Sequence, residues 1–303
     1  MSAQSLIWLI IALLGVADGI GLSAQGMSVD RDKEWAALLL ILIPVALARL
    51  CLWRNNPHAA RFATTLAQLI AFCHVGSLFT YALMAASPFQ FADALFEHAD
   101  LAIGFHWLAW FNWVNHHRIV HIILGLAFGS MVPQAFILTA FFAYMDAKRV
   151  DELLVAAMLA IIIICPIMYR LPSVGAYLPY GIVGGAWEAD ILALRSHTLL
   201  IINSVQGIVT FPSYHTVLGI LLTNMALGRK WLFYPLLGLN CLLIASVPSQ
   251  GGHYFVDMLT GVAVAFVALG ATQFLLARCS QDPLLDGNRL GRAHVFGNTL
   301  LQK

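Results

Sequence analysis

Long apolar stretches with few charges constrain the fold of this chain more than any other feature of its sequence. A helix needs about 20 mostly apolar residues to cross the hydrocarbon core of a bilayer, which is about 30 Å thick. Eight stretches of this kind are present, at 5–25, 35–53, 64–87, 119–143, 152–170, 213–227, 231–248 and 255–278. We therefore predict an all-α, polytopic membrane helix bundle with about eight transmembrane helices.

The composition excludes a water-soluble protein. Of the 303 residues, 60% are hydrophobic and only 10% are charged, whereas a soluble domain carries about 25% charged residues. The formal net charge is +1, so the sequence gives no reason to expect a nucleic-acid partner. The five cysteines are scattered through apolar regions without a C-x-x-C pair, which indicates small core residues rather than disulfides or a zinc site. We expect no metal ion and no cofactor.

The placement of charge predicts the orientation. With eight spans both termini share one face, which receives eleven of the 16 Lys and Arg residues, and the opposite face receives five. By the positive-inside rule the termini are cytoplasmic. Eight of the 11 histidines and two long connections, 88–118 and 171–212, fall on the other face. Since long connections are usually functional, we expect one membrane domain over 1–279, with its catalytic motifs in 171–261 at the non-cytoplasmic face, and a cytoplasmic tail over 280–303.

Two short motifs carry chemistry. Phe211-Pro-Ser-Tyr-His-Thr216 precedes the sixth apolar stretch, and Gly251-Gly-His-Tyr-Phe-Val-Asp257 precedes the eighth. His215 and His253 are 38 residues apart, about two helices and a turn, so both return to the same membrane face. His253 and Asp257 are spaced i, i+4 on one helix face, where the carboxylate can accept the imidazole N–H and make the histidine more nucleophilic.

The first motif is suited to binding a phosphate. Ser213 and the backbone N–H groups of Tyr214 and His215 would open a helix and form an anion site. Gly252 in the second motif lets the backbone approach a bound group closely, and His215 can act as the acid. A structural interpretation would make each motif a capped helix start or a hydrogen-bonded pair. Ionisable residues at membrane depth favour function, and both motifs begin helices on one face.

At these motifs the sequence resembles the type 2 phosphatidic acid phosphatase superfamily. Pro212-Ser-Tyr-His215 is similar to the family's second motif, Pro-Ser-Gly-His, and His253-x-x-x-Asp257 to the end of its third. The wider stretches from Ile208 and from His253 are most similar to the inositol phosphorylceramide synthase-like (aureobasidin-resistance) branch, and the stretch from Asp100 to Trp107 resembles a less specific element of it. The resemblance implies a six-helix phosphatase-like core.

The sequence departs from this family at its cationic residues. The first motif, Lys-x6-Arg-Pro, is absent, and Val247 stands where the third motif has its arginine, six residues before the histidine. Arg195 in the second long connection is our preferred replacement, because a guanidinium can hold two phosphate oxygens. Arg170, at the end of the fifth stretch, fits an interface anchor better.

The resemblance implies a mechanism without a metal ion. His253 attacks phosphorus to form a phosphohistidine, Asp257 orients it, and His215 protonates the leaving oxygen, while Arg195 and the helix N-termini supply positive charge. With water as acceptor the protein is a lipid phosphatase, which we rank first. With an alcohol it is a lipid phosphotransferase of the inositol phosphorylceramide synthase type. A non-catalytic transporter or scaffold is the alternative from another class, and the joint presence of these residues with Ser213 argues against it.

Overall fold

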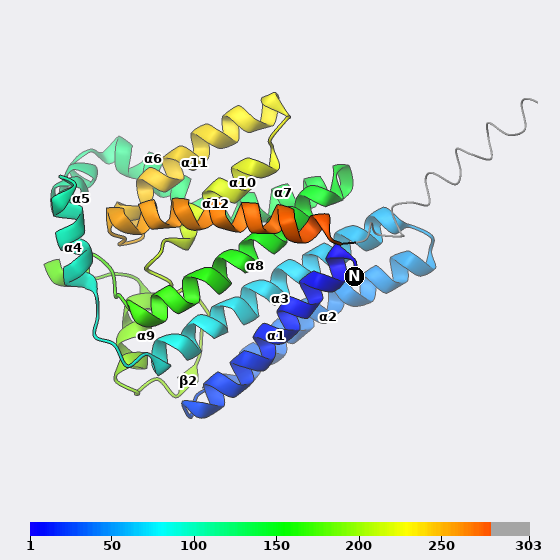
Figure 1. The fold of residues 1–303 in the computed structure, drawn as a ribbon, viewed down its shortest axis with the longest axis horizontal. Helices are drawn as coiled ribbons and strands as arrows, with labels where there is room; N and C mark the ends of the chain where they lie inside the picture. The colour runs from blue at the N-terminus through cyan, green and yellow to red at the C-terminus, as the bar shows by residue number, and fades with distance from the viewer. Residues whose placement is uncertain (280–303) are drawn as a thin grey trace, which may run out of the picture.

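The computed structural model describes residues 1–279, which form a helical bundle (Figure 1). The predicted tail, 280–303, lies outside the described residues. The described helices are α1 (Ala3–Ala24), α2 (Arg31–Trp53), α3 (Pro57–Ala86), α4 (Asp93–Ala102), α5 (Trp107–His116), α6 (Arg118–Gly129), α7 (Met131–Met145), α8 (Ala147–Arg170), α9 (Ala186–Arg195), α10 (Tyr214–Met225), α11 (Lys230–Gln250) and α12 (Phe255–Ala277). The all-α prediction is confirmed.

The described part of the chain contains six helices that are long and apolar enough to cross a membrane, namely α1, α2, α3, α8, α11 and α12. The consecutive helices α6 and α7 form a seventh candidate span, bent by 43°. The protein is therefore a multi-pass integral membrane protein, with six or seven candidate spans rather than the eight predicted.

Two predicted spans differ from the structure for local reasons. The stretch 119–143 is broken because Pro133 lacks an N–H and its ring clashes with the carbonyl of Gly129, four residues earlier. The stretch 213–227 yields only the 12 residues of α10, about 18 Å of helix at 1.5 Å per residue. That length is too short for a full crossing, so α10 begins inside the bundle.

The centre of the bundle is α8, which packs against α1, α3, α7, α10 and α12. Figure 1 shows α12, α8, α3 and α1 lying side by side in that order. A helix that is apolar on all sides belongs in a core, and the side chains of α8 that are almost completely buried include Leu154, Val155, Ala156, Met158, Ala160 and Ile164.

Helices α3 and α8 run side by side in the same direction. Near their N-terminal ends Arg61 forms an ion pair with Asp151, and near their C-terminal ends the Ser87 hydroxyl donates to the Tyr169 carbonyl at 2.8 Å. The N-terminal ends of α3 and α8 therefore lie at one level of the bundle, and their C-terminal ends lie together at the other.

Helix α10 runs opposite to α8. The Tyr214 hydroxyl at its start donates to the Ala157 carbonyl at 3.2 Å, and Arg149 near the start of α8 donates to the Leu227 carbonyl just after α10 ends, also at 3.2 Å. The first residues of α10 thus lie at the level of the middle of α8.

The two long connections fold over one end of the bundle. Residues 88–118 form α4 and α5, and 171–212 form a 3-10 turn (Leu178–Tyr180), α9 and strand β2 (Ile201–Ile202), which pairs in parallel with β1 (Ser28–Val29). Figure 1 shows α4, α5, α9 and β2 at the end opposite the N-terminus. The turn between α11 and α12 packs against this cap, because α5 contacts α11 and α4 contacts α12.

Close packing of α10 against α12 depends on Gly261, and this gives a testable prediction. A Cβ on Gly261 would lie 2.6 Å from the Ser213 carbonyl oxygen and 3.1 Å from Thr216 Cβ. We expect Gly261→Ala to lower the melting temperature in detergent, since overpacking a core costs about 1–3 kcal/mol. The matched control is Gly270→Ala on the same helix, where a Cβ meets nothing within 4 Å. Equal melting temperatures for the two variants would contradict this packing.

Candidate active site

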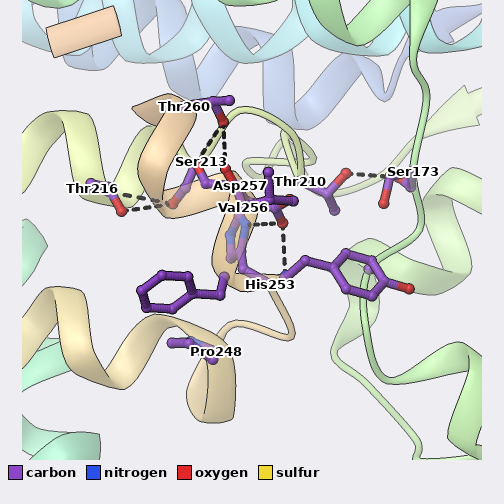
Figure 2. Close-up of polar contacts among 12 residues, drawn as sticks. Ser173, Thr210, Ser213, Thr216, Pro248, His253, Val256, Asp257 and Thr260 are labelled. Atoms are coloured by element: carbon purple, nitrogen blue, oxygen red, sulfur yellow. Dashed lines mark hydrogen bonds and ion pairs between the residues drawn. The ribbon is translucent and has the colours of Figure 1, made fainter. Parts of the chain in front are cut away.

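His253 and Asp257 form a buried pair where the turn after α11 enters α12 (Figure 2). The His253 Nδ1 lies 3.2 Å from Asp257 Oδ2, which also accepts the Tyr254 backbone N–H at 2.9 Å. His253 is 2% exposed and Asp257 is fully buried. The i, i+4 spacing predicted this contact.

Burial also sets the charge state of His253. Loss of solvation lowers the pKa of its imidazole below the ordinary value. A lowered pKa means that the ring is neutral at neutral pH. Neutral imidazole is the form that can act as a nucleophile.

His215 faces the contact between His253 and Asp257 from the first turn of α10. Its ring centroid lies 5.6 Å from that of His253, with the planes at 74°, and it stacks on Phe128 of α6 at 4.8 Å. Its Nδ1 is buried and has no hydrogen-bond partner among the described residues. The structure thus brings together His215 and His253, called the histidine pair below, as their spacing predicted.

Ser213 links the two motifs at the start of α10. Its backbone N–H donates to the Asp257 carbonyl at 3.0 Å, and its hydroxyl accepts the Thr216 N–H at 3.3 Å as the helix N-cap. The N–H groups of Tyr214 and His215 have no described partner within residues 1–279. They remain available for an anion, while the buried Ser213 hydroxyl caps the helix.

The start of α12 is already occupied by a carboxylate. Asp100 of α4 accepts the N–H groups of Phe255 at 2.8 Å and Val256 at 2.9 Å, and it is 1% exposed. The sequence placed Asp100 in a weakly specific element without giving it a role. The expectation that the helix N-termini supply positive charge is therefore wrong for α12, and for α10 it stays a prediction.

Trp107 fixes the turn that carries His253. Its indole N–H lies 3.1 Å from the Pro248 carbonyl and 3.0 Å from the His253 carbonyl. Since α5 begins at Trp107, the first long connection holds the backbone of the candidate nucleophile. The sequence placed Trp107 at the end of the weakly specific element that begins at Asp100, and nothing in the spacing indicates a contact across more than 140 residues.

Gly252 is approached closely by the protein itself. Its φ is +63°, and a Cβ there would lie 2.9 Å from the Tyr177 ring. Its carbonyl accepts the Ala176 N–H at 2.6 Å, and the Tyr177 hydroxyl donates to the Ser249 carbonyl at 2.8 Å. The close approach predicted for a phosphate is made here by the second long connection, and a phosphate contact at Gly252 stays a prediction.

Arg195 is engaged away from the histidine pair. Its guanidinium donates to the carbonyls of Ser87 and Phe89 and lies 5.4 Å from the centre of the Phe91 ring. No described contact in residues 1–279 joins it to the histidine pair, so its phosphate role stays a prediction. Arg170 lies over the Phe89 ring at 5.0 Å, which agrees with an anchoring role.

The fold and the site together define a multi-pass membrane protein with a buried histidine and carboxylate centre. A family model described as the PAP2 superfamily matches residues 94–271, more than half of the chain. The chain belongs to this superfamily, whose members are usually phosphatases, and this supports phosphoric ester hydrolysis in general. The match does not single out the inositol phosphorylceramide synthase-like branch. No curated protein and no solved structure matches the chain.

Proposed function

We propose that the protein hydrolyses a phosphate ester of a membrane lipid through a phosphohistidine on His253. The observation that carries this proposal is the buried contact between His253 and Asp257. His215 faces this contact, with its ring centroid 5.6 Å from that of His253. A neutral imidazole oriented by a carboxylate is an activated nucleophile. A second imidazole on the other side of the reacting group can act as the general acid.

The steps follow from these positions. Asp257 accepts the proton on Nδ1, so Nε2 of His253 attacks phosphorus and the P–O bond to the lipid alcohol breaks. Burial and the neighbouring His253 lower the pKa of His215, so the proton that His215 gives to the departing alkoxide comes from the bound phosphate ester in its monoanionic form. Water then attacks the phosphohistidine, His215 takes a proton from it, and inorganic phosphate leaves. Proton transfer of this kind contributes about 10²–10⁴-fold to the rate.

We place the phosphate oxygens at the start of α10. The N–H groups of Tyr214 and His215 point out of a helix N-terminus, where the dipole favours an anion. Because Asp100 fills the equivalent position on α12, the phosphate is held on the side of the general acid. Arg195 is the cation we assign to the same phosphate.

A lipid is the substrate class that suits this location. The cap over the site includes α4 and α5, short helices of ten residues each, of the amphipathic kind that lies in a membrane interface. The large apolar side chains that this region leaves exposed are Leu95, Leu101, Ile103, Leu108 and Trp113. A substrate anchored in the bilayer reaches such a site by lateral diffusion.

A phosphotransferase is the second candidate, favoured by the motifs from Ile208 to His215 and from His253 to Asp257. The same intermediate would then pass its phosphoryl group to an alcohol. Phosphate release without an added acceptor supports the hydrolase, while transfer of the phosphorus label from the donor lipid to an added alcohol such as ceramide, without release of inorganic phosphate, supports the transferase. A non-catalytic protein gives neither result.

The phosphoenzyme gives the most direct prediction. With radiolabelled lipid phosphate and a rapid quench in alkaline detergent, wild type and His215→Ala should carry label that later acid treatment removes, and His253→Ala should carry none. His215→Ala should lose about 10²–10⁴-fold in rate with an alkyl ester and much less with nitrophenyl phosphate, whose leaving group needs little protonation. His121→Ala, at an exposed histidine on α6, is the matched control. Label on His253→Ala would show that the nucleophile is another residue.

Arg195 gives a second prediction. If it binds phosphate, Arg195→Ala should lower kcat/KM about 10-fold to 100-fold, because hydrogen bonds to charged groups contribute about 1.5–3 kcal/mol. Arg195→Lys should recover only part, since an ammonium cannot make the bidentate contact. The control is Arg170→Ala, which removes a guanidinium with a similar aromatic contact. A fall in melting temperature without a fall in kcat/KM would assign Arg195 to its contacts with Ser87 and Phe89 instead.

We further propose that the termini are cytoplasmic and that the site opens on the other face. In a variant without the native cysteines, Val183→Cys, at a position that is 94% exposed, should react with an impermeant maleimide on intact cells. Leu227→Cys, at a position that is 50% exposed in the turn after α10, should react only after the membrane is opened. The reverse pattern would invert the orientation.

A further inference from the structure

We propose that an apolar channel beside His215 holds one hydrocarbon chain of the substrate and limits its length. The channel is a cavity of about 300 Å³ enclosed by α3, α7, α8 and α10, and His215 is part of its wall. This inference rests on the proposed function, because it places the lipid part of the same substrate. Nothing in the motifs points to it, since most of its lining lies outside them.

The shape of the channel suits a single chain. On α3 its wall extends from Leu69 to Thr80, which at about 1.5 Å per residue is a length of about 16 Å. A volume of about 300 Å³ spread over that length leaves a narrow space. An extended hydrocarbon chain fits such a space.

The two ends of the channel differ in polarity. Because α10 runs opposite to α3 and α8, His215 lies closer than Leu222 does to the end that includes Ser77 and Thr80. The other end is formed by leucines with little or no exposure, Leu69, Leu154 and Leu222. An amphiphile whose phosphate lies at the histidine pair would therefore place its tail among these leucines.

The side of the channel at α7 leads to the bilayer. Val132 and Phe136 are part of its lining and are 56% and 40% exposed. They lie on the bent candidate span formed by α6 and α7, so this side faces the lipid phase. A lipid chain can thus enter between α3 and α7 without leaving the membrane, and the leucine end limits how far it extends.

A substitution that narrows the channel tests this directly. Ala135 of α7 is part of the lining, and Ala135→Phe should block a long chain. We expect kcat/KM for palmitoyl lysophosphatidic acid to fall at least tenfold relative to the octanoyl compound, within the range that shape differences in apolar pockets produce. Activity on nitrophenyl phosphate, which has no chain, should stay unchanged. Ala140→Phe, on the same helix and outside the lining, should leave both the palmitoyl to octanoyl ratio and the activity on nitrophenyl phosphate unchanged.

A binding measurement keeps the channel testable without turnover. Cys73 is exposed and is part of the lining. In a variant that retains only this cysteine, palmityl phosphate should slow its reaction with N-ethylmaleimide, and inorganic phosphate should not.

The outcomes separate the two proposals. If the wild type releases phosphate from no ester, the proposed function fails, and protection of Cys73 alone decides the channel. An unchanged palmitoyl to octanoyl ratio in an active Ala135→Phe overturns the channel and leaves the hydrolase. If Ala135→Phe loses activity on every substrate, the protection of Cys73 is measured in the protein that keeps Ala135. The proposal is then overturned if palmityl phosphate leaves the reaction of Cys73 unchanged, and it is supported if palmityl phosphate slows that reaction.

Discussion

Asp257 joins the two motifs through its carboxylate and its carbonyl. The carboxylate contacts His253 Nδ1 at 3.2 Å and accepts the Tyr254 N–H at 2.9 Å, while the carbonyl accepts the Ser213 N–H at 3.0 Å. Each contact is buried, where water does not compete for the same groups. A shift of Asp257 would therefore move the imidazole, the start of α12 and the start of α10 together.

The two helix N-termini of the site are used differently because of this connection. Asp100 neutralises the start of α12 with two backbone hydrogen bonds, so that helix holds its histidine and carboxylate in place. Among the described residues no carboxylate contacts the first N–H groups of α10, which lie next to His215. In the proposed reaction an incoming phosphate would therefore be attracted to the helix that bears the proposed acid and would meet the proposed nucleophile from the neighbouring helix.

Sequence reasoning reached the features that depend on local spacing. Apolar length predicted the long helices, and the i, i+4 and 38-residue spacings predicted that the histidines and Asp257 meet. Apolar length did not predict the break before Pro133 or the shortness of α10, because hydropathy does not locate the residue at which a helix begins or ends within an apolar run.

The contacts of Asp100, Trp107 and Arg195 join segments far apart in the chain, and no single motif records them. Asp100 and Val256 are separated by 156 residues, yet the Asp100 carboxylate accepts the Val256 backbone N–H at 2.9 Å. Such contacts arise only once the long connections have folded over the bundle. The residues that hold the site are therefore less visible in the sequence than the residues proposed to react.

The burial of the histidine pair bears on which acceptor takes the phosphoryl group. His253 is 2% exposed, so a phosphohistidine there is shielded from bulk water until the lipid alcohol departs. In the proposed reaction the acceptor then enters beside His215, which has given up its proton and is now the nearby base. Water needs only that space, whereas a second lipid alcohol must also place a chain of its own in the channel. The channel proposed here would therefore favour hydrolysis over transfer from one lipid to another.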